Sequence, residues 1–189
     1  MRDNPLQFAV MREDSTLEAQ LVRRASLRCP LLVASGGCTA LALAAEFPGL
    51  EIDLVDPNPA QLAQVQAKVE ALRRTQGDPV ARARAFNLGD DDPAGLSAKG
   101  NFESLFRGFR DFLREFVAPA EELAGLLAAP ADPANLRARI FAHPYWSVAF
   151  ELFFHDSLLT AMFGPAAVQH AVPGSYPAYF RGVLERGWS

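Results

Sequence analysis

Over residues 15–76, segments whose hydrophobic positions recur with helical periodicity alternate with short runs of consecutive apolar residues. Behind Ser15 or Thr16 as a cap, apolar residues at 17, 21, 22 and 25 share one helical face and predict a helix that ends before Pro30. Apolar runs predict strands over 31–34 and 51–55, with a helix over 39–47 between them. A further helix is expected from Pro59, behind Asn58 as N-cap. Its apolar residues recur at steps of three and four, at Leu62, Val65, Val69 and Leu72.

The rest of the chain has a helical pattern. Residues 82–87 are compatible with a third short strand or with the end of a helix. An amphipathic helix is expected over 102–117, and its aromatic stripe favours a core position over a membrane surface. The stripe consists of Phe102, Phe106, Phe109, Leu113 and Phe116. Helices are also expected near 119–128, 133–142 and 145–162, with a short one ending at Arg186.

Composition narrows the class of protein. The 189 residues are 50% hydrophobic, which is enough for one domain with a hydrophobic core. Within this domain we expect a strand–helix–strand part over 31–75 and a helical part over 100–189. A net charge of −4 gives no overall attraction to nucleic acid, and no uncharged run is long enough to span a bilayer. Cys29 and Cys38 flank the first strand, too far apart for a disulfide, which suits a reducing cytoplasm. We therefore expect a soluble cytoplasmic protein.

The turn after the first strand is the main candidate for a binding site. Ser35, Gly36, Gly37 and Cys38 connect a strand to a helix N-terminus, where glycines allow close backbone approach and unpaired N–H groups favour anions. Asp56 lies twenty positions after Gly36, at the end of the next strand, where a carboxylate can accept ribose hydroxyls. This pattern predicts a nucleoside-binding unit. The alternative is a tight turn, with Asp56 capping the following helix.

Four segments together resemble a known family. They are 8–14 (FAVMRED), 33–40 (VASGGCTA), 55–61 (VDPNPAQ) and 164–180 (GPAAVQHAVPGSYPAYF), with further likeness at 100–106 (GNFESLF). This ordered set is similar to the S-adenosylmethionine:diacylglycerol 3-amino-3-carboxypropyl transferases that begin betaine-lipid synthesis. The resemblance implies an α/β, Rossmann-like class I S-adenosylmethionine-binding fold, with peripheral membrane contact to reach a lipid substrate.

The resemblance assigns the cofactor S-adenosylmethionine to the glycine turn. Backbone N–H groups from Gly36 to Cys38 suit its carboxylate, and Asp56 suits its ribose. Glu13 or Asp14 is expected beside its amine or sulfonium, although an acid pair at a helix start also favours the macrodipole. Ser35 and Asn58 lie in the segments that match the family, and they complete the expected set of cofactor-binding residues.

His170 is the candidate general base, and Tyr176 or Tyr179 would orient it or the substrate. The alternative for His170 is a hydrogen bond within a Pro-Gly turn. His143 and His155 are interpreted as structural. The triplet Asp90-Asp91-Asp92 is interpreted as a solvated loop, and no metal site is expected. A methyltransferase and a non-catalytic binding or assembly module are the alternative functions.

Members of this family continue beyond the point where this chain stops at Trp188-Ser189, and the continuation should supply later strands. Two strands leave an open edge and an uncovered face. We therefore expect a helix-rich, incomplete variant of the fold. Such a chain would form a homo-oligomer, pair with a partner chain, or close its core with its own helices.

Overall fold

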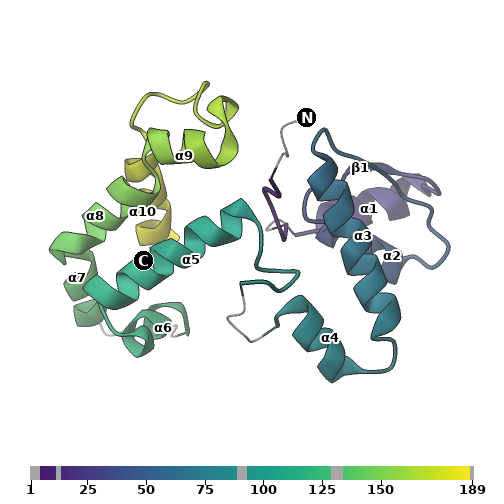
Figure 1. Cartoon of the computed structure of the whole chain (residues 1–189), viewed down its shortest axis with the longest axis horizontal. Helices are drawn as coiled ribbons and strands as arrows, with labels where there is room; N and C mark the ends of the chain where they lie inside the picture. Colours follow the sequence, from purple (N-terminus) through teal and green to yellow (C-terminus); the bar gives the residue numbers. More distant parts are fainter. Residues whose placement is uncertain (1–4, 12–13, 89–92, 129–133, 188–189) are drawn as a thin grey trace. The chain divides into compact units, whose positions relative to one another are not determined.

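The computed structural model describes residues 5–11, 14–88, 93–128 and 134–187 (Figure 1). The chain divides into two compact units, Met1–Ser104 and Leu105–Ser189. Among the described residues, the longest helices are α3 (Pro59–Arg74) and α5 (Asn101–Phe116). Each unit has its own cluster of buried hydrophobic side chains.

The first unit is built on one strand–helix–strand element. Its helices and strands are α1 (Thr16–Ala25), β1 (Leu31–Val33), α2 (Cys38–Glu46), β2 (Asp53–Val55), α3 and α4 (Pro79–Phe86). The strands pair in parallel, with Leu32 opposite Leu54. Val22 of α1 and Leu43 of α2 are buried in a small core against which Leu32 packs. The strand–helix–strand prediction is therefore confirmed, with strand and helix ends within two residues of those expected.

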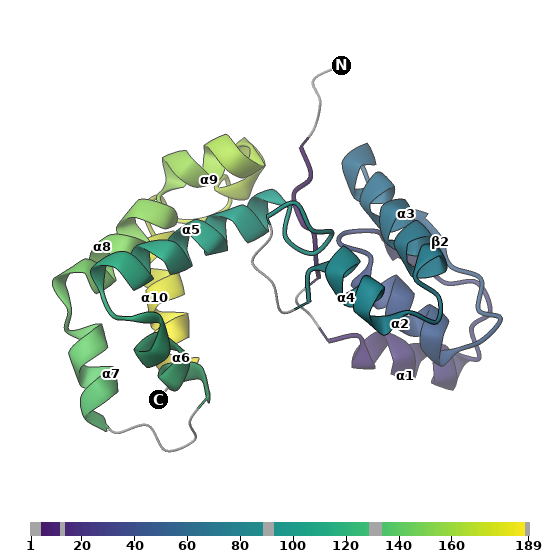
Figure 2. The ribbon, with the colours of Figure 1, turned by 60° about the horizontal axis from the view of Figure 1, so that its bottom comes forward.

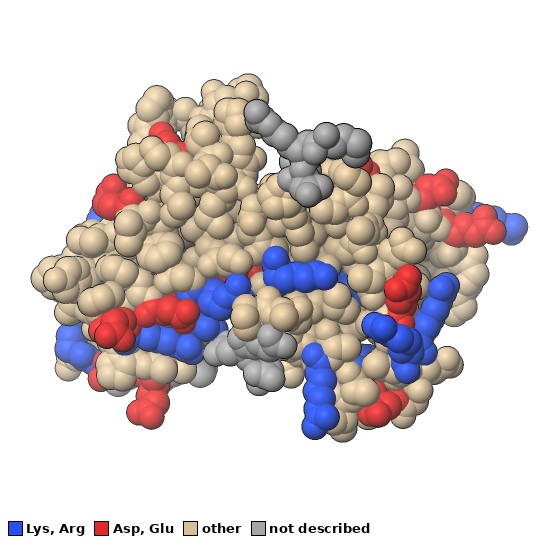
Figure 3. Space-filling model, in the orientation of Figure 1, with Lys and Arg blue, Asp and Glu red and all other residues tan. Residues whose placement is uncertain are grey.

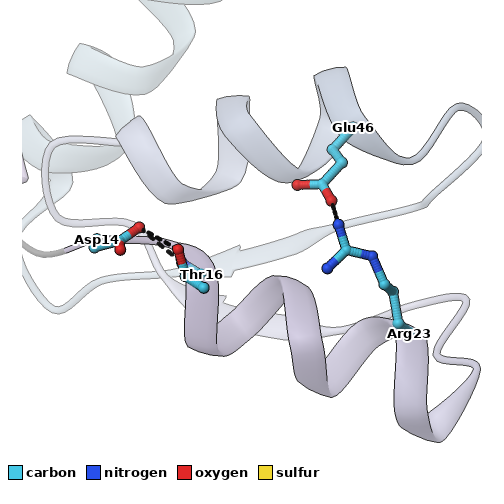
Figure 4. Close-up of polar contacts among 4 residues, drawn as sticks. All are labelled: Asp14, Thr16, Arg23 and Glu46. Carbon is cyan, nitrogen blue, oxygen red and sulfur yellow. Dashed lines mark hydrogen bonds and ion pairs between the residues drawn. The ribbon is translucent and has the colours of Figure 1, made fainter.

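An ion pair joins the two helices of this small core at the surface. The Arg23 guanidinium of α1 contacts the Glu46 carboxylate at the end of α2 (Figure 4). Arg23 also lies 5.4 Å from the centre of the Phe47 ring, measured from its guanidinium carbon. Because both charged groups are exposed to solvent, this pair contributes little to stability.

The predicted Rossmann-like α/β fold is wrong. In the part of the chain that the structure describes, the only sheet has two strands of three residues each, and most other residues are helical. Residues 82–87, where a third strand was considered, belong largely to α4. Local capping explains this outcome, because the Asp78 carboxylate accepts hydrogen bonds from the N–H groups of Val80 and Ala81. Pro79 at the first helical position further favours a helix start.

One face of the small sheet remains uncovered. Leu32 and Leu54 are half-buried, whereas alternate residues on the other face are exposed. The exposed fractions are 65% for Leu31, 68% for Val33 and 48% for Val55. This largely apolar face, named here the open sheet face (Leu31, Val33 and Val55, with the exposed Asp53 opposite Leu31), is the uncovered surface that the short strand pattern predicts.

The second unit is helical throughout its described elements (Figure 2). After α5 come α6 (Ala120–Ala128), α7 (Ala134–Phe141), α8 (Pro144–Phe153), α9 (Asp156–Phe163), a 3-10 turn (Pro165–Ala167) and α10 (Tyr176–Gly187). Phe109 and Leu113 of the α5 stripe are buried, and the ring centroid of Phe109 lies 5.0 Å from that of Phe150. Trp146 is 1% exposed, and its indole N–H donates to Glu185 at 2.9 Å. The core position is therefore confirmed for Phe106, Phe109 and Leu113, whereas Phe102 pairs with Phe8 of the first unit and Phe116 is 48% exposed.

Histidines start two consecutive helices of this unit. The prediction of a single helix over 145–162 is wrong, because α8 ends at Phe153 and α9 begins at Asp156. Nδ1 of His143 accepts from the N–H of Tyr145 at 3.3 Å, and Nδ1 of His155 accepts from the N–H of Ser157 at 3.2 Å. Each imidazole thus acts as an N-cap, which supports the structural interpretation of both histidines.

Replacing His155 with Ala is expected to destabilise the second unit by about 1 kcal/mol, because an N–H group in the first turn of α9 loses its acceptor. Chemical denaturation followed by circular dichroism measures this change. His155→Asn is the matched control, because its amide oxygen restores the cap and should recover most of the loss. Equal destabilisation by the two variants would contradict the capping role.

None of the helices in the described ranges combines the length and the apolar composition needed to cross a bilayer. Charged side chains of both signs lie interspersed on the face drawn in Figure 3. The balance of 18 basic and 22 acidic residues gives the chain its small negative net charge.

Candidate functional site

The turn between β1 and α2 has an unusual backbone. Ser35 has φ of +44° and Gly37 has φ of +79°, so two residues of this turn lie in the left-handed region. Gly37 is the N-cap of α2, and no side chain caps the helix there. The first N–H groups of an α-helix have no partner within the helix, and they carry partial positive charge. This end of α2 is therefore suited to an anionic group.

Asp56 connects this turn to the end of β2. One carboxylate oxygen accepts from the N–H of Ser35 at 3.1 Å, and the other accepts from the N–H of Asn58 at 2.9 Å. These two bonds use about half of the acceptor capacity of a carboxylate. Since Asp56 is only half-buried, the remaining capacity is open to a ligand that carries hydroxyl groups.

The chain itself occupies the space beside both glycines. A Cβ atom on Gly36 would lie 2.6 Å from the carbonyl carbon of Val10 and 2.7 Å from the nitrogen of Met11. A Cβ atom on Gly37 would lie 2.7 Å from a methyl group of Val65 on α3. Glycine at both positions is thus explained by close packing within the first unit. The segment 5–11, named here the strap, runs directly against the turn.

A row of polar side chains on α3 holds the strap. Asn58 Nδ2 donates to the carbonyl of Pro5 at 2.9 Å. Gln61 is 2% exposed and pairs with Phe8, whose N–H donates to Oε1 at 3.1 Å and whose carbonyl accepts from Nε2 at 3.0 Å. Gln61 Nε2 also donates to the carbonyl of Ser35 at 2.6 Å. Since these contacts reach main-chain atoms of both segments, they fix the strap and the turn together.

Lys68 and Glu103 hold the next residue of the strap from two sides. Lys68 Nζ donates to the carbonyls of Ala9 at 2.6 Å and Gly36 at 2.7 Å. The Glu103 carboxylate accepts from the N–H groups of Ala9 at 2.8 Å and Val10 at 3.3 Å. Burial lowers the pKa of Lys68, and the neighbouring Cys38 sulfur and Glu103 carboxylate partly offset this effect. The cation is therefore buried, with main-chain oxygens as its closest partners.

The apolar stripe of α3 is only in part its buried face, because Val65 is buried and Val69 and Leu72 are half-buried. Leu62 is 37% exposed, whereas the buried residues are Gln61, Gln64, Val65, Lys68 and Ala71. The sequence does contain a signal for this arrangement. Asn58, Gln61, Gln64 and Lys68 follow one another at steps of three and four, which places a second, polar stripe along the helix. Asn58 as N-cap is confirmed, because its Oδ1 accepts from the N–H of Ala60.

Of the two acids predicted near the cofactor, Glu13 lies outside the described residues. The Asp14 carboxylate accepts from both the N–H and the hydroxyl of Thr16, at 3.0 and 2.7 Å (Figure 4). These bonds lower the pKa of Asp14. Asp14 therefore caps the start of α1 as an exposed carboxylate, which is the alternative role considered for it.

The candidate catalytic residues lie in the second unit. His170 is exposed, with its Nε2 2.8 Å from Nε2 of Gln169. The Tyr176 hydroxyl donates to the carbonyl of Ala167 at 2.7 Å, and Tyr179 is 60% exposed. His170 thus presents an imidazole at the surface of the loop that precedes α10. Tyr176 stabilises the start of this loop.

The cysteines have contrasting surroundings. Both thiols are free, as the sequence predicts. A hydrogen bond to the Asp53 carboxylate, together with burial and charge, raises the pKa of the exposed Cys29. Cys38 is half-buried at the start of α2, where its sulfur accepts from the N–H of Met11 at 3.4 Å. The described residues contain no group of three or more His, Cys, Asp and Glu side chains placed to hold a metal ion, and Asp90-Asp91-Asp92 lies outside them.

Comparison with known proteins adds no family to this picture. A scan against family models, a search of curated proteins and a search of solved structures each found no match. The resemblance to aminocarboxypropyl transferases therefore rests on the matching sequence segments themselves.

Proposed function

We propose that the first unit binds S-adenosylmethionine at the turn from Ser35 to Cys38 and at Asp56. The observation that carries this proposal is the Asp56 carboxylate at the end of β2, joined to the N–H of Ser35 at the end of β1. The helix end beside it has no side-chain cap and suits the ligand's carboxylate. The half-used acceptor capacity of Asp56 suits ribose hydroxyls, so the residues present fit this ligand.

The proposed reaction is transfer of the 3-amino-3-carboxypropyl group to a lipid hydroxyl, such as that of diacylglycerol. The ligand supplies a carbon chain attached to a sulfonium, which is already a good leaving group. The chain then has two tasks, to orient the acceptor and to remove its hydroxyl proton. The sequence resemblance, and not the arrangement of the two units, assigns the removal of that proton to His170 and the positioning of its loop to Tyr176. The sequence resemblance, rather than the geometry, selects this reaction over methyl transfer.

Product analysis tests the reaction. The purified chain is incubated with S-adenosylmethionine and diacylglycerol vesicles, and the nucleoside products are separated. Methylthioadenosine is the expected product, because transfer of the carbon chain leaves the methyl group on sulfur. S-adenosylhomocysteine would instead identify a methyltransferase and contradict the proposed reaction.

A non-catalytic binding or assembly module is the second candidate. It is favoured by the packing of Val10 and Met11 against Gly36, since the strap occupies space that a glycine turn can offer to a ligand. Binding without either nucleoside product over long incubation would support this candidate.

Replacing Asp56 with Ala is expected to weaken S-adenosylmethionine binding by roughly one to two decades. Each hydrogen bond to a charged group contributes about 1.5–3 kcal/mol, and the ribose would lose its acceptor. Titration calorimetry measures the dissociation constant. Asp53→Ala is the matched control, because Asp53 is an exposed acid on the same strand and contacts Cys29 rather than the turn. Unchanged affinity in a folded Asp56→Ala variant would contradict the assignment of the binding site to Asp56.

A further inference from the structure

A cysteine and a buried lysine meet beside the glycine turn. Lys68 Nζ lies 3.6 Å from the sulfur of Cys38, within hydrogen-bonding distance for a sulfur acceptor. Lys68 is 1% exposed, whereas Cys38 is half-buried and stays within reach of a small reagent. The proposed binding role uses neither the amine of Lys68 nor the thiol of Cys38.

The lysine is held in place by its other contacts. Its ammonium donates to the carbonyls of Ala9 and Gly36, which come from different segments of the first unit. The N–H of Met11 approaches the same sulfur from the strap. Because the main chain restrains both partners, the amine and the sulfur stay close together without the entropy cost of bringing two free side chains together.

We propose that Cys38 and Lys68 form an oxidative modification site, at which a peroxide joins the two side chains through a sulfur–nitrogen bond. In the first step, the Cys38 thiol reacts with hydrogen peroxide. The peroxide O–O bond breaks, one oxygen stays on sulfur as a sulfenic acid, and the other leaves as water. Sulfur is oxidised by two electrons and the peroxide is reduced.

In the second step, the nitrogen lone pair of the neutral Lys68 amine attacks the sulfur. The new sulfur–nitrogen bond forms as the sulfur–oxygen bond breaks, and the hydroxide leaves with a proton from the nitrogen as a second water. Sulfenic acids undergo the corresponding condensation with backbone nitrogen. Burial favours the neutral amine that this step needs, since desolvation disfavours the ammonium. The product has two hydrogen atoms fewer than the reduced chain.

The cross-link would change how the strap is held. The linked nitrogen keeps a single hydrogen, so it cannot donate to both Ala9 and Gly36 as the ammonium does. Ala9 and Gly36 are both buried, and at Ala9 only a 3.4 Å bond from Gln64 Nε2 would remain, so the lost hydrogen bond is costly unless the strap moves to reach water. Oxidation at this pair should therefore loosen the strap, and a thiol reductant should restore it.

The test uses the full chain and hydrogen peroxide. Intact mass spectrometry is expected to show a species lighter by two hydrogen atoms, with a Cys38–Lys68 linked peptide after digestion. Dithiothreitol is expected to restore the original mass. Hydrogen exchange at the amides of residues 8–11 should be faster in the oxidised chain than in the reduced chain.

The second cysteine provides the matched control. Cys29 has an acid rather than an amine as its neighbour, so Cys29→Ser should keep the cross-link and Cys38→Ser should lose it. Lys68→Gln should stop at the sulfenic acid, detected with dimedone. If Lys68→Gln fails to fold, the two cysteine variants still decide the outcome. A folded Cys29→Ser chain that gains only oxygen, or that shows no change in mass, would overturn the proposal.

Discussion

A chain with Lys68 replaced by Ala is expected to lose about 3–5 kcal/mol of stability in its first unit. Two main-chain carbonyls, those of Ala9 and Gly36, would lose their shortest hydrogen bond inside the protein, and at Ala9 only a 3.4 Å bond from Gln64 Nε2 would remain. Each unsatisfied buried polar group costs about 1–3 kcal/mol. The Glu103 carboxylate would also lose the favourable charge of the neighbouring ammonium, and the shorter side chain would leave a cavity.

Hydrogen exchange is the suitable measurement, because a chain with two compact units need not unfold in one step. Exchange at amides of α2 and α3 reports the first unit, while exchange at amides of α8 serves as an internal reference. Lys99→Ala is the matched control, since Lys99 is an exposed lysine of the same unit and should change stability by less than about 0.5 kcal/mol. Lys68→Met fills most of the volume and separates the cavity from the lost hydrogen bonds. An effect of Lys68→Ala no larger than that of Lys99→Ala would show that the lysine does not hold the strap.

Local signals in the sequence predicted most elements of the first unit. Asn58 before Pro59 and the apolar runs around Gly36 and Gly37 are short-range features, and each determines the structure of a few neighbouring residues. The histidine caps are short-range features as well. Nδ1 of His155 accepts from the N–H of Ser157, and this cap starts a new helix within a continuous apolar pattern. Sequence periodicity does not reveal such an interruption, because Phe154 and Leu158 fit one helical stripe.

The candidate site was only partly predictable, because its second half depends on contacts between distant segments. The position of Asp56 relative to Ser35 follows from two parallel strands. The burial of Gln61 and Lys68 depends instead on the strap, which lies more than fifty residues away in the sequence. A buried polar stripe is rare, since polar groups are costly to bury unless each finds a partner. Hydrophobic patterning therefore identified Val65 but missed the polar residues that share the buried face of α3.

The apolar content of residues 105–187 is explained without a larger sheet. Trp146, Phe150 and Phe154 of the second unit are each 1% exposed, and they form a core with α5 and α10. The truncated α/β fold expected from the family resemblance is thus not needed to bury these side chains. This core consists of side chains of the second unit, and the open sheet face of the first unit stays exposed.

Self-association through the open sheet face is the final expected result. Leu31 and Val33 each expose about two-thirds of their surface on one face of a sheet whose strands are both edge strands. Full burial of a Leu or Val side chain contributes about 1.5–3 kcal/mol, so a Leu31→Thr and Val33→Thr double variant should associate roughly two decades more weakly. Light scattering across micromolar concentrations measures the change. Leu17→Thr is the matched control, because Leu17 is 65% exposed but lies on α1. A wild-type chain that stays monomeric and binds no hydrophobic dye would show that this face is stable in water without a second copy.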